Sequence, residues 1–297
     1  MKILVTGSNG LLGQKLVELI LTKEDHLIAT AKSKLAIDLP RGEFHFLDIT
    51  RLEEVEKVIS ETKPDVIINT AAMTQVDHCE TEREKCWLNN VTAVENLVNT
   101  CEKTDTRLIH VSTDFIFDGT RGPLDELEKP NPLSYYGESK LAAEVAVQKS
   151  KTDWAILRTV LVFGITKDMS RSNIVLWVKK SLEEGKTINV VNDQWRTPTL
   201  AEDLAMGCYL AATKKAKGIY NISGYEMMTP YDIAIATADF FKLDKSLIKQ
   251  TDSTQFKQPA ARPPKTGFII DKARKELGYQ PRNFKEGLAL LARQISA

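Results

Sequence analysis

The first half of the chain alternates short apolar runs with amphipathic segments, and this alternation narrows the fold more than any other feature. The strand-like runs are ILVT (3–6), HLIATA (26–31), FHFL (44–47), DVIINTAA (65–72), RLIHVST (107–113) and WAILRT (154–159). The helical stretches between them include GLLGQKLVELILTK (10–23), RLEEVEKVISET (51–62) and CWLNNVTAVENLVNTCEK (86–103). Nearly continuous apolar strands that alternate with helices indicate a parallel sheet covered on both faces. With right-handed crossovers, the sequence predicts a doubly wound α/β fold of the Rossmann type.

After about residue 164 the pattern changes to a mixture of helices, strands and longer loops. Strands are predicted at 187–191 and 218–223, and helices at 173–184, 201–213, 230–241 and 284–295. Loops rich in proline and charge occupy 192–199 and 255–267. We therefore predict a dinucleotide-binding domain at 1–164 and a smaller mixed α/β region at 165–297 that mainly binds a substrate. Segments of the second region can return to the first domain.

The composition gives the chain no overall attraction to polyanions. Forty basic residues balance forty acidic ones, so neither nucleic acid nor an anionic membrane surface is an expected partner. The four cysteines form no CxxC pair and no ligand cluster with the four histidines, which predicts reduced thiols and no metal site. The N-terminus lacks a signal-peptide pattern, and no apolar run is long enough to span a bilayer. A cytoplasmic protein is expected.

A glycine-rich turn lies between the first predicted strand and the first predicted helix. Its glycines in ILVTGSNGLLG let the backbone turn tightly and let a pyrophosphate approach closely. The helix that follows offers free amide hydrogens and the positive end of its dipole. The spacing is GxxGxxG and not the GxGxxG of many dehydrogenases, but the position on the first βα unit favours dinucleotide binding over an empty turn. The predicted contacts are Gly7, Asn9, Gly10, Leu11, Leu12 and Gly13.

The end of the second strand selects the kind of dinucleotide. An acidic residue there would hold the ribose 2′-hydroxyl of NAD and repel a 2′-phosphate. The chain reads TAKSK instead, and the cations of Lys32 and Lys34 beside the hydroxyl of Ser33 favour NADPH. NADH stays open, because these lysines can equally be solvated surface residues. At the end of the third strand, Asp48 and Ile49 are predicted to lie beside the adenine.

A tyrosine and a lysine four residues apart point to proton transfer. Asn131 and Pro132 predict a helix start, and the helix through SYYGESKLAAE places Tyr136 and Lys140 on one face. Tyr135 lies about 100° away around the helix axis. An ammonium group beside a phenol lowers the phenol pKa, so Tyr136 can donate a proton at neutral pH, as the reduction of a carbonyl by hydride requires.

A strand-end hydroxyl completes this set. The strand RLIHVST ends at Ser112 and Thr113, next to the expected nicotinamide position, and either hydroxyl can hydrogen-bond the reacting carbonyl. The glycine turn, these hydroxyls and YxxxK, in this order and spacing, resemble the extended short-chain dehydrogenase/reductase family. The segments TGSNGLLG, NTAAMTQVDHCE, STDFIFDG, YYGESKLAAE, LRTVLVFG and NDQWRTPT together resemble its dTDP-4-dehydrorhamnose reductase subgroup. The resemblance covers nearly the whole chain.

The resemblance implies an activity and a catalytic set. The activity is the NADPH-dependent reduction of the 4-keto group of a nucleotide-linked 6-deoxyhexose, with dTDP-4-dehydrorhamnose, which gives dTDP-rhamnose, as the first candidate. Thr113, Tyr136 and Lys140 match the family's catalytic positions, and the last two also touch the cofactor. Ala71 and Ala72 would line the nicotinamide.

Four further residues are assigned by the resemblance, each with a plain alternative. Asn90 falls where the wider family has a helix asparagine that supports the lysine through water, and the alternative is an ordinary polar helix residue. The segment AMTQVDHCE matches the family pattern AxTxVDxxE, so Thr74, Val76 and Asp77 are predicted to line the sugar pocket. The alternative is that the acidic residues of this segment only favour the N-terminus of the next helix.

The predicted substrate contacts in the second region come from two loops. NDQWRTPT matches the family's DQxxxPT loop but carries Trp195 and Arg196 where the reductases commonly have glycine. Arg196 can bind a diphosphate bidentately and Trp195 can stack on a base. AARPPKTGF resembles the family's Arg-Pro segment and offers Arg262 to the diphosphate. The departure at Trp195-Arg196 leaves the nucleotide base open.

Sister activities leave several alternatives. Sugar-nucleotide 4,6-dehydratases carry Asp-Glu after the strand-end threonine, whereas this chain has Asp114 and Phe115, which argues against dehydration. Another nucleotide-sugar reductase, an epimerase, and a non-catalytic NADP-binding subunit like the regulatory subunit of eukaryotic methionine adenosyltransferase stay open. The sugar, the base and the oligomeric state also stay open, with a homodimer as one assembly.

Overall fold

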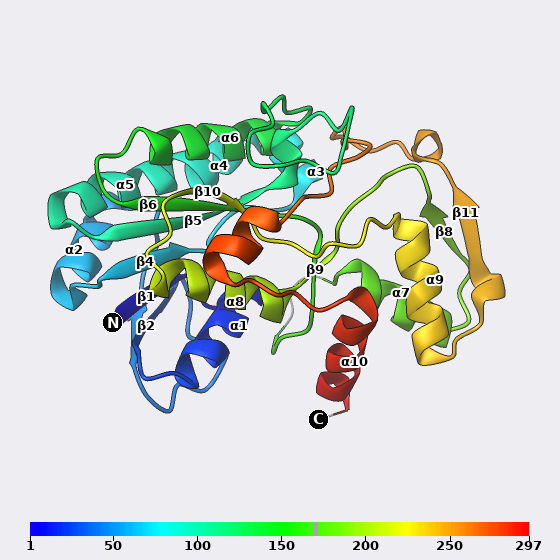
Figure 1. The fold of residues 1–297 in the computed structure, drawn as a ribbon, viewed down its shortest axis with the longest axis horizontal. Coiled ribbons are helices and arrows are strands. Elements are labelled where there is room, and N and C mark those ends of the chain that lie inside the picture. The colour runs from blue at the N-terminus through cyan, green and yellow to red at the C-terminus, as the bar shows by residue number, and fades with distance from the viewer. Residues whose placement is uncertain (169–171, 297) are drawn as a thin grey trace.

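A seven-stranded parallel sheet forms the centre of the computed structural model, which describes residues 1–168 and 172–296. The strand order is β10-β6-β5-β4-β1-β2-β3, and helices cover both faces (Figure 1). The doubly wound α/β prediction is therefore confirmed. The strands are β1 (Lys2–Thr6), β2 (His26–Ala31), β3 (Glu43–Phe46), β4 (Val66–Asn69), β5 (Arg107–Thr113), β6 (Trp154–Thr159) and β10 (Gly218–Asn221).

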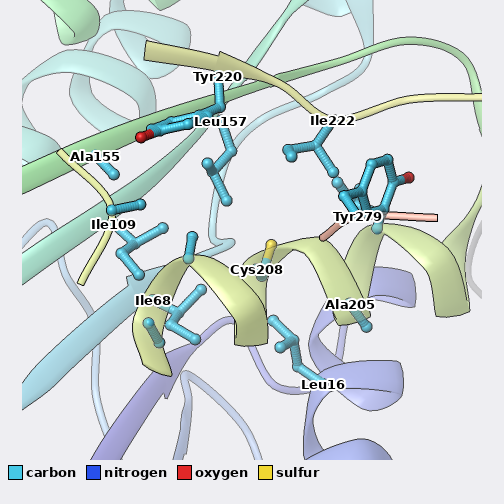
Figure 2. Packing of buried hydrophobic residues seen from close by; sticks show 14 of the residues in the cluster. Leu16, Ile68, Ile109, Ala155, Leu157, Ala205, Cys208, Tyr220, Ile222 and Tyr279 are labelled. Atoms are coloured by element: carbon cyan, nitrogen blue, oxygen red, sulfur yellow. The ribbon is translucent and has the colours of Figure 1, made fainter. Parts of the chain in front are cut away.

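Alternate side chains of each central strand enter two separate cores, because strand side chains point to opposite faces. Ile3 and Val5 of β1 join the core beneath α1 (Leu11–Leu21) and α8 (Ala201–Thr213). Leu4 faces the other core, which includes α2 (Leu52–Thr62), α5 (Ala93–Thr104) and α6 (Tyr135–Gln148). Figure 2 shows Leu16 of α1 and Ala205 and Cys208 of α8 packed in the first core with strand residues such as Ile68, Ile109 and Leu157. Burial on both faces explains the nearly continuous apolar strands.

The second half of the chain builds a smaller region and also returns to the sheet. Its helices α7 (Ile174–Glu183), α9 (Pro230–Phe241) and α10 (Phe284–Ile295) lie close to the predicted bounds. Two short parallel pairs join β8 (Ile188–Val191) to β11 (Ile248–Thr251), and β7 (Val162–Phe163) to β9 (Thr199–Leu200). Capping boxes at Thr229 and Asn283 start α9 and α10. The chain crosses back to the large sheet after residue 164, because β10 is one of its strands and α8 packs against one of its faces.

Short helices fill the connections. The short elements are α3 (Val76–Thr81), α4 (Arg83–Trp87), η1 (Leu88–Thr92), η2 (Asp114–Ile116), η3 (Lys245–Leu247), η4 (Ser253–Gln255) and η5 (Ala273–Leu277). The segment predicted as one helix over 86–103 is divided in the structure: the π-helical turn η1 lies between the short helix α4 and α5.

The predicted start of α6 was wrong by three residues. The helix begins at Tyr135, because the hydroxyl of Ser134 accepts a hydrogen bond from the Gly137 amide and caps it. The Asn131 side chain donates instead to Asp118 at 2.9 Å. The phase that places Tyr136 and Lys140 on one face is unchanged.

Within residues 1–168 and 172–296, none of the helices combines the length and the apolar character that crossing a membrane requires. All four cysteines are buried free thiols.

Candidate active site

The glycine turn of the predicted cofactor site is closed by contacts that tolerate no side chain. Gly7 has a φ of +67°, which favours glycine, and the Gly10 amide donates to its carbonyl at 2.9 Å. A Cβ on Gly13 would lie 2.2 Å from the Gly7 oxygen, and one on Gly7 would lie 2.9 Å from the Ala71 Cα. The turn therefore sits against both the start of α1 and the segment after β4. This is a cradle that a pyrophosphate can approach at backbone distance.

Asn9 ties this turn to the end of β2. Its amide donates to the Ser33 hydroxyl at 3.1 Å and to the Lys34 carbonyl at 3.0 Å, and its oxygen accepts from the Ala36 amide at 2.9 Å. The turn predicted to bind the pyrophosphate and the segment predicted to bind the 2′-phosphate are thus held together by one side chain.

Lys32 and Asp48, assigned separately to the 2′-phosphate and the adenine, form an ion pair at 3.0 Å. Burial opposes ionisation of Asp48, but hydrogen bonds from Thr50 and Lys32 outweigh it and lower its pKa. Both side chains keep substantial exposure, at 50% and 29%, so the Lys32 ammonium can still face a ligand from the solvent side. Ile49 is buried in the core beneath α2 and α5.

The catalytic candidates come from the end of β5 and the first turns of α6. Thr113 donates to the Asp114 carboxylate at 3.1 Å and accepts from the Phe115 amide at 3.2 Å. Tyr136 is buried, with its ring edge-to-face against Phe115 at 5.7 Å between centroids. A Cβ on Gly137 would lie 2.2 Å from the Phe115 carbonyl oxygen. The absent side chain lets α6 meet η2, the turn that follows β5, in direct backbone contact.

Lys140 lies one turn beyond Tyr136, and its side chain is almost completely buried. Its ammonium donates to the Val111 carbonyl at 2.8 Å and lies 3.2 Å from Nε2 of His110. Burial lowers the pKa of Lys140 to about 8, while the nearby Glu144 carboxylate acts in the opposite direction. The sequence reading missed His110, although its alternation with Leu108 in β5 would have placed it on the buried α6 face.

A buried ion pair anchors α6 to the sheet. Arg158 of β6 binds both carboxylate oxygens of Glu144, at 3.0 and 2.7 Å. Their side chains are 3% and 0% exposed, so neither charge has water as an alternative partner. This pair was also missed from sequence.

Asn90 joins the segment after β4 to α6. Its oxygen accepts from the Met73 amide at 2.8 Å, and its amide group donates to the Met73 carbonyl and the Ser139 hydroxyl, each at 3.0 Å. Asn90 thus holds the residue that follows Ala71 and Ala72 next to the helix that carries Tyr136 and Lys140.

The structure pairs two of the predicted substrate residues. Arg262 binds both oxygens of Asp77, at 3.0 and 2.6 Å, across 185 residues of sequence. The Ala260 amide adds a hydrogen bond at 3.1 Å. These hydrogen bonds lower the pKa of Asp77, and those from the Arg262 guanidinium have the largest effect. The neighbouring Val76 begins α3, and Thr74 in the preceding segment is exposed.

Arg196 is turned into the protein. Its guanidinium donates to the carbonyls of Trp195, Pro263 and Pro264 and lies 3.5 Å from the Asp114 carboxylate. Only 5% of Arg196 is exposed, so a diphosphate contact would require these bonds to open. Trp195 is 39% exposed.

Asp114 collects contacts from three parts of the chain. Besides Arg196 and the Thr113 hydroxyl, its carboxylate accepts from the Thr266 hydroxyl at 2.5 Å. Burial raises the pKa of Asp114, and Arg196 opposes that effect. From sequence, Asp114 entered only the comparison with the dehydratases, in which Phe115 was the departure, and its role as a junction was missed.

A parallel doubly wound sheet with a glycine-rich first turn and a Thr-Tyr-Lys set at its carboxyl edge defines an α/β protein of the extended short-chain dehydrogenase/reductase class. The family model described as RmlD substrate binding domain matches residues 1–296, and the chain belongs to this family.

Two relatives show the range of the family. The chain is 32% identical over 98% of its length to a probable low-salt glycan biosynthesis reductase, Agl14, of Haloferax volcanii, of which 97% is covered. It is 34% identical over 83% of its length to the β subunit of methionine adenosyltransferase 2 from Xenopus tropicalis, of which 74% is covered.

Two solved structures agree with this placement. A dTDP-4-dehydrorhamnose reductase from Clostridium acetobutylicum superposes with a TM-score of 0.90 at 28% identity, with both chains fully covered. The reductase of Bacillus anthracis, solved with NADP, gives a TM-score of 0.85 at 26% identity, with 99% of each chain covered. The predicted resemblance to the dTDP-4-dehydrorhamnose reductase subgroup of NAD(P)H-dependent oxidoreductases is confirmed.

Proposed function

We propose that the protein reduces the 4-keto group of a nucleotide-linked 6-deoxyhexose with NADPH, and that dTDP-4-dehydrorhamnose is the substrate. The observation that carries the proposal is the placement of Thr113, Tyr136 and buried Lys140 at the carboxyl edge of the sheet. Ligands of open α/β sheets bind at this edge. The relatives named as dTDP-4-dehydrorhamnose reductases support the choice of substrate.

The residues of the cofactor site fit NADPH. The glycine cradle leaves room where a Cβ would clash, and the amides at the start of α1 face it. Lys32 and Ser33 stand at the end of β2, where a 2′-phosphate is bound in this fold. NADH is the alternative cofactor. When bound, the reduced nicotinamide supplies a hydride to C4 of the sugar.

The chain supplies the proton and the orientation. The Tyr136 phenol donates its proton to the oxygen that develops negative charge at C4. Lys140 stabilises the phenolate that remains and holds the nicotinamide ribose. The Thr113 hydroxyl, which now donates to Asp114, must turn toward the substrate carbonyl to orient it.

The test is the oxidation of NADPH with an enzymatically prepared dTDP-4-keto-6-deoxy sugar, followed by the absorbance of the reduced nicotinamide. We expect Tyr136→Phe to lose at least ~100-fold in turnover, the scale of general acid catalysis, while its NADPH affinity stays unchanged. Tyr135→Phe is the matched control, because the Tyr135 ring packs near Trp87 and Arg83; it should retain most of the turnover. Near-normal turnover of Tyr136→Phe would contradict the assignment.

A second candidate is a non-catalytic NADP-binding subunit, which the likeness to the methionine adenosyltransferase β subunit favours. Tight NADP binding without oxidation by any keto-sugar nucleotide would establish it. An epimerase would instead retain its nicotinamide cofactor through turnover. The cytoplasmic location and the homodimer stay predictions, and sedimentation of the purified protein tests the latter.

A further inference from the structure

A row of buried polar side chains runs through the sheet behind Lys140. Thr6 of β1 pairs in register with Asn69 of β4, and Asn69 pairs with His110 of β5, so their side chains share the α6 face of the sheet. The Thr6 hydroxyl lies 2.6 Å from Asn69 Oδ1, and Asn69 Nδ2 lies 3.1 Å from His110 Nδ1. His110 Nε2 then meets Lys140 Nζ at 3.2 Å. All four residues are at most 3% exposed, so water is not an alternative partner for the row, and the further partners are the Val111 carbonyl at Lys140 and the Ala71 amide at Thr6.

The direction of these hydrogen bonds fixes the proton on His110. Burial, reinforced by the charge of Lys140, holds the pKa of His110 well below its usual range, so the ring is neutral and carries one proton. Asn69 Nδ2 can only donate, so His110 Nδ1 must accept and the ring proton lies on Nε2. That N–H points at Lys140 Nζ. Only a neutral amine has a lone pair to receive it.

An ammonium group at Lys140 demands the opposite arrangement. It has only donors, so His110 Nε2 must accept and the ring proton must lie on Nδ1. Asn69 then has to present its oxygen to His110 and its amide group to Thr6. The Thr6 hydroxyl then accepts from Asn69, so the number of hydrogen bonds in the row is unchanged, but its own hydrogen loses the Asn69 oxygen as acceptor. The row therefore couples the charge of Lys140 to the tautomer of His110, and it favours the neutral amine by the cost of that buried hydroxyl hydrogen.

The other groups that face Lys140 act on the same balance. Glu144, one turn further along α6, favours the ammonium, although its carboxylate is bound by Arg158 of β6. The Cys86 thiol of α4 acts in the same direction as Glu144. Tyr136 shares the helix face with Lys140.

We infer that His110 is a positioning residue for Lys140 and that, with Asn69 and Thr6, it selects the charge state of Lys140 through its tautomer. The inference rests on the proposed role of Lys140 beside Tyr136. A neutral Lys140 no longer offers its positive charge to the phenol, so the row sets the pH above which Lys140 stops assisting proton donation by Tyr136.

The tautomer can be read without any substrate by nuclear magnetic resonance of protein labelled with ¹⁵N-histidine. The His110 signals are assigned as those missing in His110→Gln, and the exposed ring of His26 is the internal reference. We expect the Nε2–H form above the Lys140 pKa of about 8 and the Nδ1–H form below it. In Lys140→Met the tautomer should not change with pH. An imidazolium at neutral pH, or one tautomer from about pH 7 to about pH 9.5 in the wild type, overturns the inference.

A pH profile of turnover gives a second readout. In His110→Gln the side-chain amide can present its oxygen to the ammonium, so the alkaline fall in turnover should move up by about one pH unit. Asn69→Ala, which removes the donor to Nδ1, should move it in the same direction. Unshifted profiles in both variants contradict the inference. A pH-dependent tautomer in a protein that reduces no keto sugar would refute only the proposed function.

Discussion

The two halves of the proposed site are held by different kinds of contact. On the catalytic side, Thr6, Asn69 and His110 are register partners on neighbouring strands, and Arg158 and Glu144 are only 14 residues apart. On the substrate side, Asp77 binds Arg262 across 185 residues and Asp114 binds Thr266 across 152. Regular elements carry the first set, whereas loops of the second half of the chain carry the partners in the second. The sheet therefore preorganises the catalytic side, whereas hydrogen bonds between side chains hold the loops of the substrate side together.

This difference predicts that changes on the catalytic side alter the stability of the fold, while changes on the substrate side mainly alter substrate affinity. Three variants test it, in descending order of expected effect on stability.

Arg158→Met should have the largest effect, because it leaves the fully buried Glu144 carboxylate without its cation. Removing one partner of a buried pair costs about 3–5 kcal/mol. Urea unfolding of the variant measures this cost. The double variant Arg158→Met with Glu144→Leu removes both charges and should recover most of the loss. A loss below about 1 kcal/mol in the single variant would mean that the pair does not anchor α6.

Lys140→Met should change how stability depends on pH. The folded-state pKa of Lys140, about 8, lies below that of an exposed lysine near 10.4. Between these pH values the unfolded chain binds a proton that the folded chain does not, so stability rises with pH. The wild type should gain about 3 kcal/mol more than Lys140→Met between about pH 7 and about pH 10.5. Parallel curves of unfolding free energy against pH would show that the lysine titrates normally.

Asp77→Asn should have the smallest effect on stability, since the pair with Arg262 is partly exposed and such pairs contribute about 1 kcal/mol or less. Without its carboxylate partner, Arg262 is no longer held beside α3, and we expect KM for the nucleotide sugar to rise about tenfold at unchanged kcat. Glu56→Gln, in the exposed pair with Lys103, is the matched control and should change neither constant. A fall in kcat with unchanged KM would place Asp77 on the catalytic side instead.

The catalytic side was largely predictable from sequence because it follows from periodicity. Apolar runs located the central strands, and the ends of parallel strands meet at one edge. The spacing of Tyr136 and Lys140 gave a shared helix face whatever the first residue of the helix, so the error at Pro132 did no harm. The cap of Ser134 was missed because Asn131-Pro132 carries the stronger local signal.

The rest depended on pairings that no local pattern contains. Arg196 was assigned to a diphosphate because a guanidinium can bind one bidentately, and its contacts with three backbone carbonyls and Asp114 in the structure could not be seen in the sequence. Likewise, Asp77 and Arg262 were each assigned to the substrate, and nothing in either segment showed that they would bind one another. To predict either set of contacts, one must know where the loops lie relative to one another, and that is fixed only once the sheet has folded.

The contact between Gly137 and the Phe115 carbonyl limits how closely α6 can approach the turn after β5. Backbone meets backbone there, so the separation between the first turn of α6 and the turn after β5 is set by atomic radii and does not depend on a side-chain rotamer. Side chains elsewhere on α6 can be exchanged without altering this gap, whereas the loops on the substrate side are held by the pairs Asp77–Arg262 and Asp114–Thr266. The backbone that carries Tyr136 therefore keeps its position when side chains change, whereas a substitution in either pair alters how the substrate loops are held.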